Sequence, residues 1–402
     1  VALLLTVVID IMGIGLIFPV LPELFSITHN QFFLNQNSLY TFFCVTMMIV
    51  PLGWTISGLV MGYLADMYGR KRMIMLSLII SGCSYGLSIY AISLHNLALF
   101  LFSRFLIGAS GGCYCLVQTV MCDIAPEGKL SKYLSWVNCV SALGFVMGAL
   151  ITSISTWKYI SASLYTPFII GSCLSFIDAS MVFYFVKESN TSNASANNKS
   201  LTETLKSSIS GLLNNVQARN LLIAFFLIEI AWGVYLQALP MILSQLYMYT
   251  TNNIATFYLA YGICAATAIL IVQPAFEKVF TYEVANPWLS WIVKITLAFS
   301  FIIHSHWANI SGMLIATTAE FLLFTGVLVL ISENSDESSR GQTMGMISTL
   351  IGASFLISDI LIFALKANYL RYNLLLVALL FPGFYFLSGK STKKTAETAI
   401  AS

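Results

Sequence analysis

Seven ionisable side chains fall inside long apolar stretches of this chain, where a charge is costly and a functional role is the first hypothesis. Five are carboxylates and two are bases, and they occur in both halves of the sequence: Asp10, Arg104, Asp178, Glu229, Lys294, Glu320 and Asp359. Removal from water favours the neutral form of a carboxylate, so such a group can bind and release a proton near neutral pH. The set predicts a cavity whose charges pair, bind a substrate or exchange protons.

A structural ion pair, or a side chain that reaches the membrane surface, is the alternative for each of these residues. That alternative is strongest for Asp178 and Asp359, which lie nearer the ends of their stretches. Between residues 220 and 245, an indole and an amide add stacking and hydrogen-bonding capacity, although aromatic residues are common at membrane interfaces. The expected substrate and proton-coupling residues are therefore Asp10, Arg104, Glu229, Lys294, Glu320, Gln237 and Trp232.

The stretches that carry these residues have the length and composition of membrane-spanning helices. The chain has 402 residues, of which 58% are hydrophobic and 9% charged, and its mean hydropathy is +0.84. Soluble domains are about 45–50% apolar and about 25% charged. A bilayer needs roughly 20 apolar residues per helix. Such runs fall near 1–21, 39–65, 73–93, 97–120, 133–155, 164–186, 220–245, 253–275, 286–304, 309–331, 343–365 and 371–389. We predict an all-α integral membrane protein with twelve transmembrane helices.

A polar segment divides the twelve runs into two groups of six. It is rich in Ser and Asn and poor in apolar residues, a composition typical of a flexible linker. The predicted organisation is an N-terminal six-helix half (1–186), a linker (187–219), a C-terminal six-helix half (220–390) and a tail (391–402). The sequence begins Val1-Ala2-Leu3 without Met, so we expect the first run to be a clipped membrane helix and not a signal peptide.

The distribution of Lys and Arg predicts the orientation. The even-numbered connections and the tail hold fourteen of these residues, the opposite side holds three (Lys158, Lys366 and Arg371), and the other two of the nineteen lie within helices. Because basic residues concentrate on the cytoplasmic side of a membrane, the linker and both termini are expected to be cytoplasmic.

The turn between the second and third runs, Gly62–Arg72, has a specific spacing. It reads Gly-x-x-x-Asp-x-x-Gly-Arg-Lys-Arg, and this resembles the loop between helices 2 and 3 of the major facilitator superfamily. Because both residues are glycines, we expect Gly62 to allow a close helix approach and Gly69 to adopt a backbone angle that other residues resist. The resemblance implies a conformational latch in which Asp66 meets the helix that begins near Gly341 and Arg70 pairs with Asp123. The latch residues are thus Gly62, Asp66, Gly69, Arg70, Asp123 and Gly341.

Two further motifs resemble the drug:proton antiporter branch of this superfamily, including tetracycline-efflux-like and multidrug members. The first is the run Asp10–Pro22, whose acid is implied to face a central cavity. The second is Arg104–Gly112, whose arginine is implicated in proton coupling in the family. A guanidinium cannot itself titrate but can stabilise a neighbouring carboxylate, and Asp10 is the partner we expect for Arg104. The resemblance implies proton-coupled secondary transport by alternating access, most simply drug or metabolite efflux.

Several positions depart from that branch. In the run 133–155, Gly144 and Gly148 are present, but Ala149 replaces the expected proline and Thr152-Ser153 replace a glycine pair. Residues 273–278 lack the Gly-Arg core of the first-half turn, and Lys294 stands where a tetracycline exporter would carry an acid. These departures favour a second hypothesis, a substrate-specific metabolite symporter or facilitator of the same fold.

Other classes of function have little support. The eight cysteines show no C-x-x-C spacing, so no zinc site is predicted, and no nucleotide-binding or hydrolase motif indicates a cofactor or an enzyme. The net charge of +2 gives no indication of nucleic acid binding. A polytopic receptor or membrane enzyme is the remaining alternative of another class. The expected partners are a small-molecule substrate, protons and the lipid bilayer, for a monomer in a bacterial inner membrane.

Overall fold

The computed structural model describes residues 2–17, 20–25, 30–126, 130–155, 165–188, 216–247, 249, 251–302, 306–333 and 340–365. All regular secondary structure within these ranges is helical. Nine of the described helical segments are long and apolar enough to cross a membrane. The expectation of an all-α integral membrane fold is confirmed.

The first half of the chain forms helices that coincide with the predicted runs. They are α1 (Ala2–Ile17), α2 (Leu21–Leu24), α3 (Gln36–Tyr68), α4 (Arg70–Ser93), α5 (Leu97–Ser110), α6 (Gly112–Ile124), α7 (Leu130–Ser155) and α8 (Thr166–Phe185). The predicted span 97–120 is interrupted, because α5 ends and α6 begins on either side of Gly111. Adjacent glycines are poor helix formers, which explains a break at this point.

The second half follows the same plan. Its elements are α10 (Val216–Tyr247), α11 (Thr251–Thr267), the π-helical segment η1 (Ala268–Val272), α12 (Gln273–Phe276), α13 (Tyr282–Ile302), α14 (His306–Glu333) and α15 (Arg340–Leu365). Helix α10 begins four residues before the predicted boundary at 220. The twelfth predicted run (371–389), most of the linker (189–215) and the tail (391–402) lie outside the described residues.

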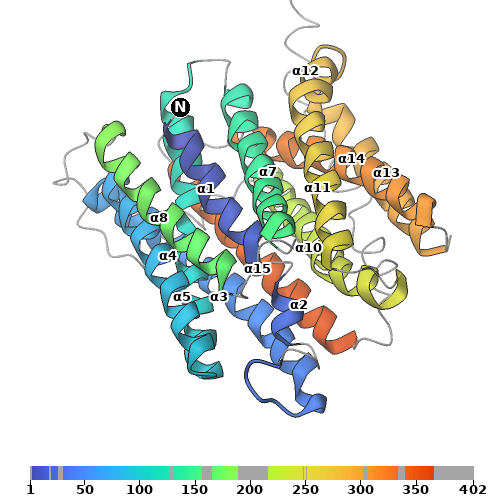
Figure 1. Ribbon diagram of the computed structural model, residues 1–402. Helices are drawn as coiled ribbons and strands as arrows, with labels where there is room; N and C mark the ends of the chain where they lie inside the picture. Colours follow the sequence, from blue (N-terminus) through green and yellow to red (C-terminus); the bar gives the residue numbers. More distant parts are fainter. Residues whose placement is uncertain are drawn as a thin grey trace, which may run out of the picture.

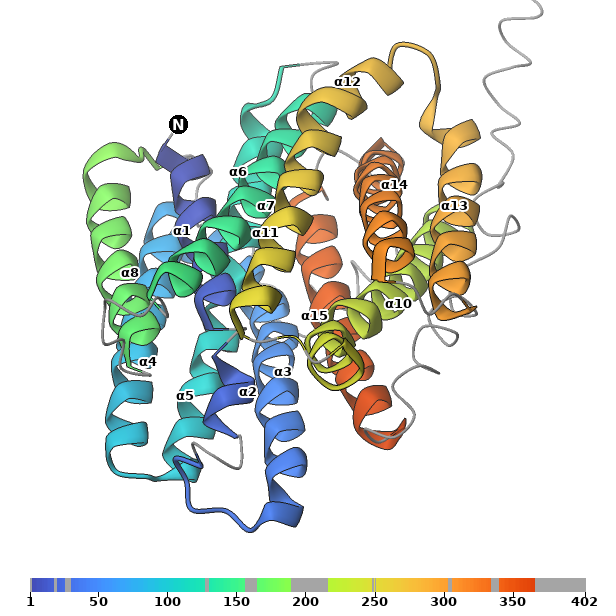
Figure 2. The ribbon, with the colours of Figure 1, turned by 45° about the vertical axis from the view of Figure 1, so that its right-hand side comes forward.

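The two halves form separate groups of helices that meet mainly along two helix pairs. Figures 1 and 2 show α1 to α8, in blue to green, on one side and α10 to α15, in yellow to red, on the other. Helix α3 packs against α15, and α7 packs against α11. Within the first half, α1 packs on α7 and α4 on α8; within the second, α13 packs on α14 and α10 on α15. Each half therefore has its own packed interior.

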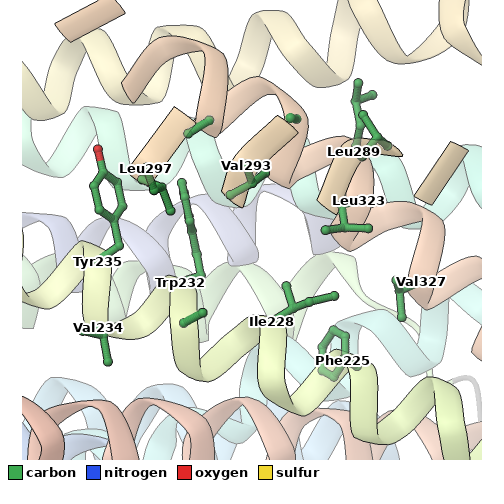
Figure 3. Close-up of a cluster of buried hydrophobic side chains, with 14 of the residues drawn as sticks. Phe225, Ile228, Trp232, Val234, Tyr235, Leu289, Val293, Leu297, Leu323 and Val327 are labelled. Atoms are coloured by element: carbon green, nitrogen blue, oxygen red, sulfur yellow. The ribbon is translucent and has the colours of Figure 1, made fainter. Parts of the chain in front are cut away.

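The interior of the second half is built by α10, α13 and α14. Figure 3 shows Trp232 of α10 directed towards Leu297 of α13, in a cluster that also contains Phe225, Leu323 and other apolar side chains. Because lipid tails are as apolar as these side chains, van der Waals packing is what holds such membrane helices together. This cluster fixes α10, which also carries residues that face the first half.

Glycines set the closest helix approaches in the first half. A Cβ at Gly148 would overlap the carbonyl oxygen of Met12, and one at Gly108 would overlap that of Val50. The backbones of α1 and α7, and of α3 and α5, are therefore in near contact, as small residues permit.

The two glycines of the Gly62–Arg72 turn have different outcomes. Gly69 has φ +97°, a left-handed angle that favours glycine, so this prediction is confirmed. The expected close approach at Gly62 is wrong: no described atom lies within 4 Å of a Cβ built there. The paired glycines of α7, Gly144 and Gly148, lie at close contacts with α1, whereas Gly62 does not lie at a close helix contact.

Candidate functional site

A cavity of about 250 Å³ lies between the two halves of the chain. Its walls come from α1 to α5 and α7 in the first half and from α10, α11 and α15 in the second. Most of its lining is apolar, and the polar or charged side chains among the described lining residues are Thr46, Trp54, Tyr85, Arg104, Gln237 and Tyr258. No carboxylate lines it among the residues that the structure describes.

Arg104 is the only charged residue described in that lining, and it is 2% exposed. Its Nη2 donates a hydrogen bond to Ser88 Oγ at 2.8 Å, whereas its buried Nε has no hydrogen-bond partner. Three aromatic rings surround the guanidinium: its carbon lies 5.1 Å from the centroid of Phe168, 5.2 Å from Phe100 and 5.9 Å from Tyr85. Cation–π attraction offsets part of the cost of burying the charge.

The other polar groups of the cavity bond to the protein itself. Thr46 Oγ1 donates to the Phe42 carbonyl at 2.7 Å, and Trp54 Nε1 donates to Ser348 Oγ at 3.1 Å. On the opposite wall, Tyr258 OH donates to the Leu236 carbonyl at 3.1 Å. Gln237 Nε2 donates to the Phe355 carbonyl at 3.2 Å and so joins α10 to α15.

Asp10 lies in a second, smaller pocket of about 30 Å³ next to the main cavity. The two spaces share the lining residues Ile11, Ile14, Val50, Trp54, Tyr85 and Ile107. The charged group that acts on Asp10 is Asp178 of α8, which is fully buried and accepts a hydrogen bond from Thr6 Oγ1 at 3.0 Å. A pocket of this size has room for one or two waters.

The expected ion pair between Arg104 and Asp10 is not formed in the part of the chain that the structure describes. Tyr85 stands between them, since its ring faces Arg104 and it lines both spaces. Asp10 instead belongs with Asp178, which the sequence suggested more weakly because it lies near the end of its run. Neither Tyr85 nor the acidic pair could be identified from spacing along the chain, because both depend on how α1, α4 and α8 pack.

Glu229 and Glu320 come together in the second half. Both are almost fully buried, at 3% and 2% exposure, on the contacting helices α10 and α14. They interact electrostatically with each other, and Glu229 Oε1 has no hydrogen-bond partner. Neither residue is part of the described lining of the cavity.

A hydrogen-bonded bridge near this acidic pair joins the two halves. Tyr114, which also lines the small pocket with Asp10, interacts electrostatically with Glu229. Its hydroxyl donates to Asn138 Oδ1 at 2.9 Å, and Asn138 Nδ2 donates to Thr325 Oγ1 at 3.3 Å. The polar groups of the two halves are thus connected through α6, α7 and α14. Asn138 was not identified from the sequence.

Two expected site residues lie away from the cavity. Trp232 is buried in the core of the second half, with its ring 5.1 Å from that of Tyr235. Lys294 lies on α13, which packs against α14, and its Nζ sits 5.1 Å from the ring of Trp291. The structure does not bring either residue together with Arg104 or Asp10.

The turn between α3 and α4 contacts the end of α8. Glu188 accepts hydrogen bonds from the backbone N–H groups of Arg70 at 2.8 Å and Lys71 at 3.4 Å, at the N-terminus of α4. Lys71 Nζ donates to the Phe183 carbonyl at 2.7 Å. The side chains of the predicted latch residues Asp66 and Asp123, and the surroundings of Gly341, lie outside what the structure describes. The sequence analysis did not identify Glu188, although this acid lies just after the sixth predicted span.

Known proteins resemble this chain both in sequence and in fold. The sequence model of one family, described as the Major Facilitator Superfamily, matches residues 3–358. The tetracycline resistance protein, class H, of Pasteurella multocida is 30% identical over 149 residues, which are 37% of this chain and 35% of that protein. The class B tetracycline resistance protein of Escherichia coli is 26% identical over 209 residues, which are 52% of this chain and 49% of that protein. The matched regions span half or less of these curated relatives.

A solved structure extends the likeness over the whole fold. The human organic anion transporter superposes with a TM-score of 0.73, covering 95% of this chain and 98% of the other, at 14% sequence identity. At this identity the likeness shows the fold alone.

Proposed function

Because the chain belongs to the Major Facilitator Superfamily, we propose that it is a proton-coupled secondary transporter that moves a small molecule across the membrane by alternating access. The observation that carries the proposal is the cavity of about 250 Å³ whose walls come from both halves. Rocking of one half against the other around such a site exposes it to one side of the membrane and then to the other.

Proton coupling is supported by two acidic pairs, one in each half of the chain. Asp10 neighbours the buried Asp178, and Glu229 neighbours Glu320, with both of these glutamates buried. Neighbouring carboxylates disfavour simultaneous ionisation, so such a pair tends to retain a proton. Tyr114 contributes to the pocket of the first pair and interacts with Glu229 of the second. Proton binding at either pair would therefore alter contacts between the halves.

Export is the direction we propose. The tetracycline resistance proteins of classes H and B match this chain over 37% and 52% of its length, and the motifs at Asp10 and Arg104 resemble the antiporter branch. We further propose that the protein is a monomer in a bacterial inner membrane, with both termini in the cytoplasm because basic residues concentrate on that side.

A substrate-specific symporter or facilitator of the same fold is the second candidate. The observation that favours it lies in α7, where Thr152 occupies a position at which the antiporter branch carries glycine. Its hydroxyl donates to the Leu16 carbonyl at 2.7 Å and to the Gly148 carbonyl at 3.1 Å, so it joins α7 to α1. That contact differs from the proline-kinked helix expected for antiport.

The test is transport by the purified protein in liposomes with an imposed pH gradient and a panel of compounds. Substrate movement and the internal pH are recorded together. Proton efflux from the lumen that depends on an added substrate supports antiport, and proton movement with the substrate supports symport. Substrate movement without any proton flux would contradict the coupling while leaving the facilitator. Failure to move any compound would contradict transport.

The turn at Gly69 and the residues Asp66, Asp123 and Gly341 are proposed to act as the latch between the halves. Helix α15 begins at Arg340, so Gly341 lies in its first turn, where the helix dipole favours a carboxylate by about 0.3–1 kcal/mol. Replacement Asp66→Asn should lower turnover more than it lowers substrate affinity. Equal loss of both would contradict a latch and indicate a binding or folding defect.

A further inference from the structure

The charge distribution around the cavity points to the class of compound that it binds. Arg104 contributes a permanent positive charge to the wall, because a guanidinium remains protonated at all physiological pH values. It forms no ion pair within the described parts of the chain. A buried charge without a counterion is unfavourable, and a bound anion would remove that cost.

One buried hydrogen-bond donor of the cavity wall also has no acceptor in the protein. The hydroxyl of Thr46, the indole N–H of Trp54 and the hydroxyl of Tyr258 all donate to protein acceptors. The Nε–H of Arg104 is buried and has no acceptor. The wall donors of Thr46, Trp54 and Tyr258 are thus already used, and an acceptor on the ligand, such as a carboxylate or phenolate oxygen, would satisfy the Nε–H of Arg104.

The rest of the cavity suits an apolar ring system. Ile14, Val50, Ile107 and Phe145 are among the side chains that line it. Its volume of about 250 Å³ lies just below the range of about 300–1,000 Å³ that drug-sized ligands occupy. The three rings around the guanidinium, from Tyr85, Phe100 and Phe168, continue the apolar surface up to the charge.

We propose that the substrate is a small lipophilic organic monoanion, with an aromatic body in the apolar cavity and its carboxylate or phenolate bound by Arg104. This inference rests on the proposed transport function, but it is tested by binding alone. A cationic compound is the opposite case, because its partner would be Asp10 in the adjacent pocket.

The experiment measures binding to the full chain in detergent by titration calorimetry with three probes of matched shape: 2-naphthoate, 2-naphthamide and 2-naphthylmethylammonium. A hydrogen bond to a charged group is worth enough that naphthoate should bind at least about tenfold more tightly than either analogue. Equal or tighter binding of the amide or the ammonium compound would overturn the proposal. So would the absence of naphthoate binding up to about 1 mM.

Variants then test the anchor. Arg104→Gln should reduce naphthoate affinity to that of the amide while amide affinity stays within about twofold. Lys294→Gln is the matched control, since it removes another base from a membrane helix but one that lies over Trp291 on α13, outside the described lining. Unchanged naphthoate affinity in folded Arg104→Gln would overturn the assignment of Arg104. If that variant does not fold, the three probes on the unaltered chain decide the outcome. Liposome transport, measured separately, decides the proposed function.

Discussion

The first half of the chain holds its buried base at the cavity wall, whereas the second half holds its buried acids away from it. Arg104 lines the cavity and is surrounded by aromatic rings, while Glu229 and Glu320 neighbour each other at the contact of α10 with α14. The base of the second half, Lys294, lies over Trp291 outside the described cavity lining. We propose from this difference that Arg104 of the first half binds the ligand, while Glu229 and Glu320 share proton binding with the Asp10–Asp178 pair of the first half.

The two halves also differ at corresponding turns. The α3–α4 turn has a left-handed glycine at 69 and a carboxylate, Glu188, that caps α4. After η1, the second half places Gln273, whose Nε2 donates to Ser135 Oγ of the first half at 2.6 Å and to Glu277 Oε1 at 2.8 Å. The second-half turn thus contacts the other half through an amide side chain. The first-half turn is instead held by Glu188 of its own half.

The largest expected effect is on proton coupling. Glu229→Gln removes an ionisable group from the acidic pair but keeps its shape, so substrate-induced proton flux in liposomes should fall to the leak rate while substrate exchange stays within about threefold. Glu283→Gln, which changes an exposed acid in the first turn of α13, is the control and should behave as the unaltered chain. Retention of full proton flux in Glu229→Gln would contradict a coupling role for the second-half pair and leave the Asp10–Asp178 pair as the proton site.

The next effect concerns ligand recognition. Arg104→Gln should lower the ratio of maximal transport rate to KM for an anionic substrate by about tenfold or more, because a charge-assisted hydrogen bond is lost. Lys294→Gln should change it by less than about twofold. The measurement is initial uptake at several substrate concentrations, together with thermal stability to identify unfolded protein. Equal losses in the two variants would remove the distinction between the two bases.

A smaller effect is expected at the bridge between the halves. Asn138→Ala leaves the hydroxyl of Tyr114 without its acceptor and breaks the bond to Thr325, which should cost about 1–3 kcal/mol of stability. Thr296→Ala is the comparison, since its hydroxyl donates to the Ile292 carbonyl of its own helix at 2.6 Å. The readout is the unfolding temperature in detergent. A decrease in Asn138→Ala no greater than in Thr296→Ala would show that the bridge contributes nothing to holding the halves together.

The helical architecture could be predicted from sequence because hydropathy is a local property of the chain. The described part of every predicted span up to residue 365 is almost wholly helical, and the interruption at Gly111 is the clearest difference. The site was less predictable, because partner choice depends on packing between distant helices. Arg104 and Gln237, both expected site residues, line one cavity, but the pairing of Asp10 with Asp178 depends on the contact of α1 with α8.

Residue type alone also misplaced some side chains. Trp232 and Gln237 lie on the same helix, five residues apart, yet one is in the core and the other lines the cavity. A helix turns about 100° per residue, so a separation of five places the two on different faces. Hydropathy does not distinguish those faces when both are apolar, since the core and the cavity wall have the same composition.

The last expected effect is a local one, and it separates the two glycines of the α3–α4 turn. Gly69→Ala forces a side chain into the left-handed region at φ +97° and places its Cβ 2.5 Å from Glu188 Oε2, so it should cost about 1–3 kcal/mol. Gly62→Ala meets no described atom within 4 Å, and alanine favours helix by up to about 1 kcal/mol, so stability should be unchanged or slightly higher. Thermal unfolding of both variants in the same detergent measures the difference. If Gly62→Ala is the more destabilised variant, we would infer that a neighbouring helix approaches residue 62 closely in another state of the transport cycle. The turn between α3 and α4 would then change its surroundings during transport.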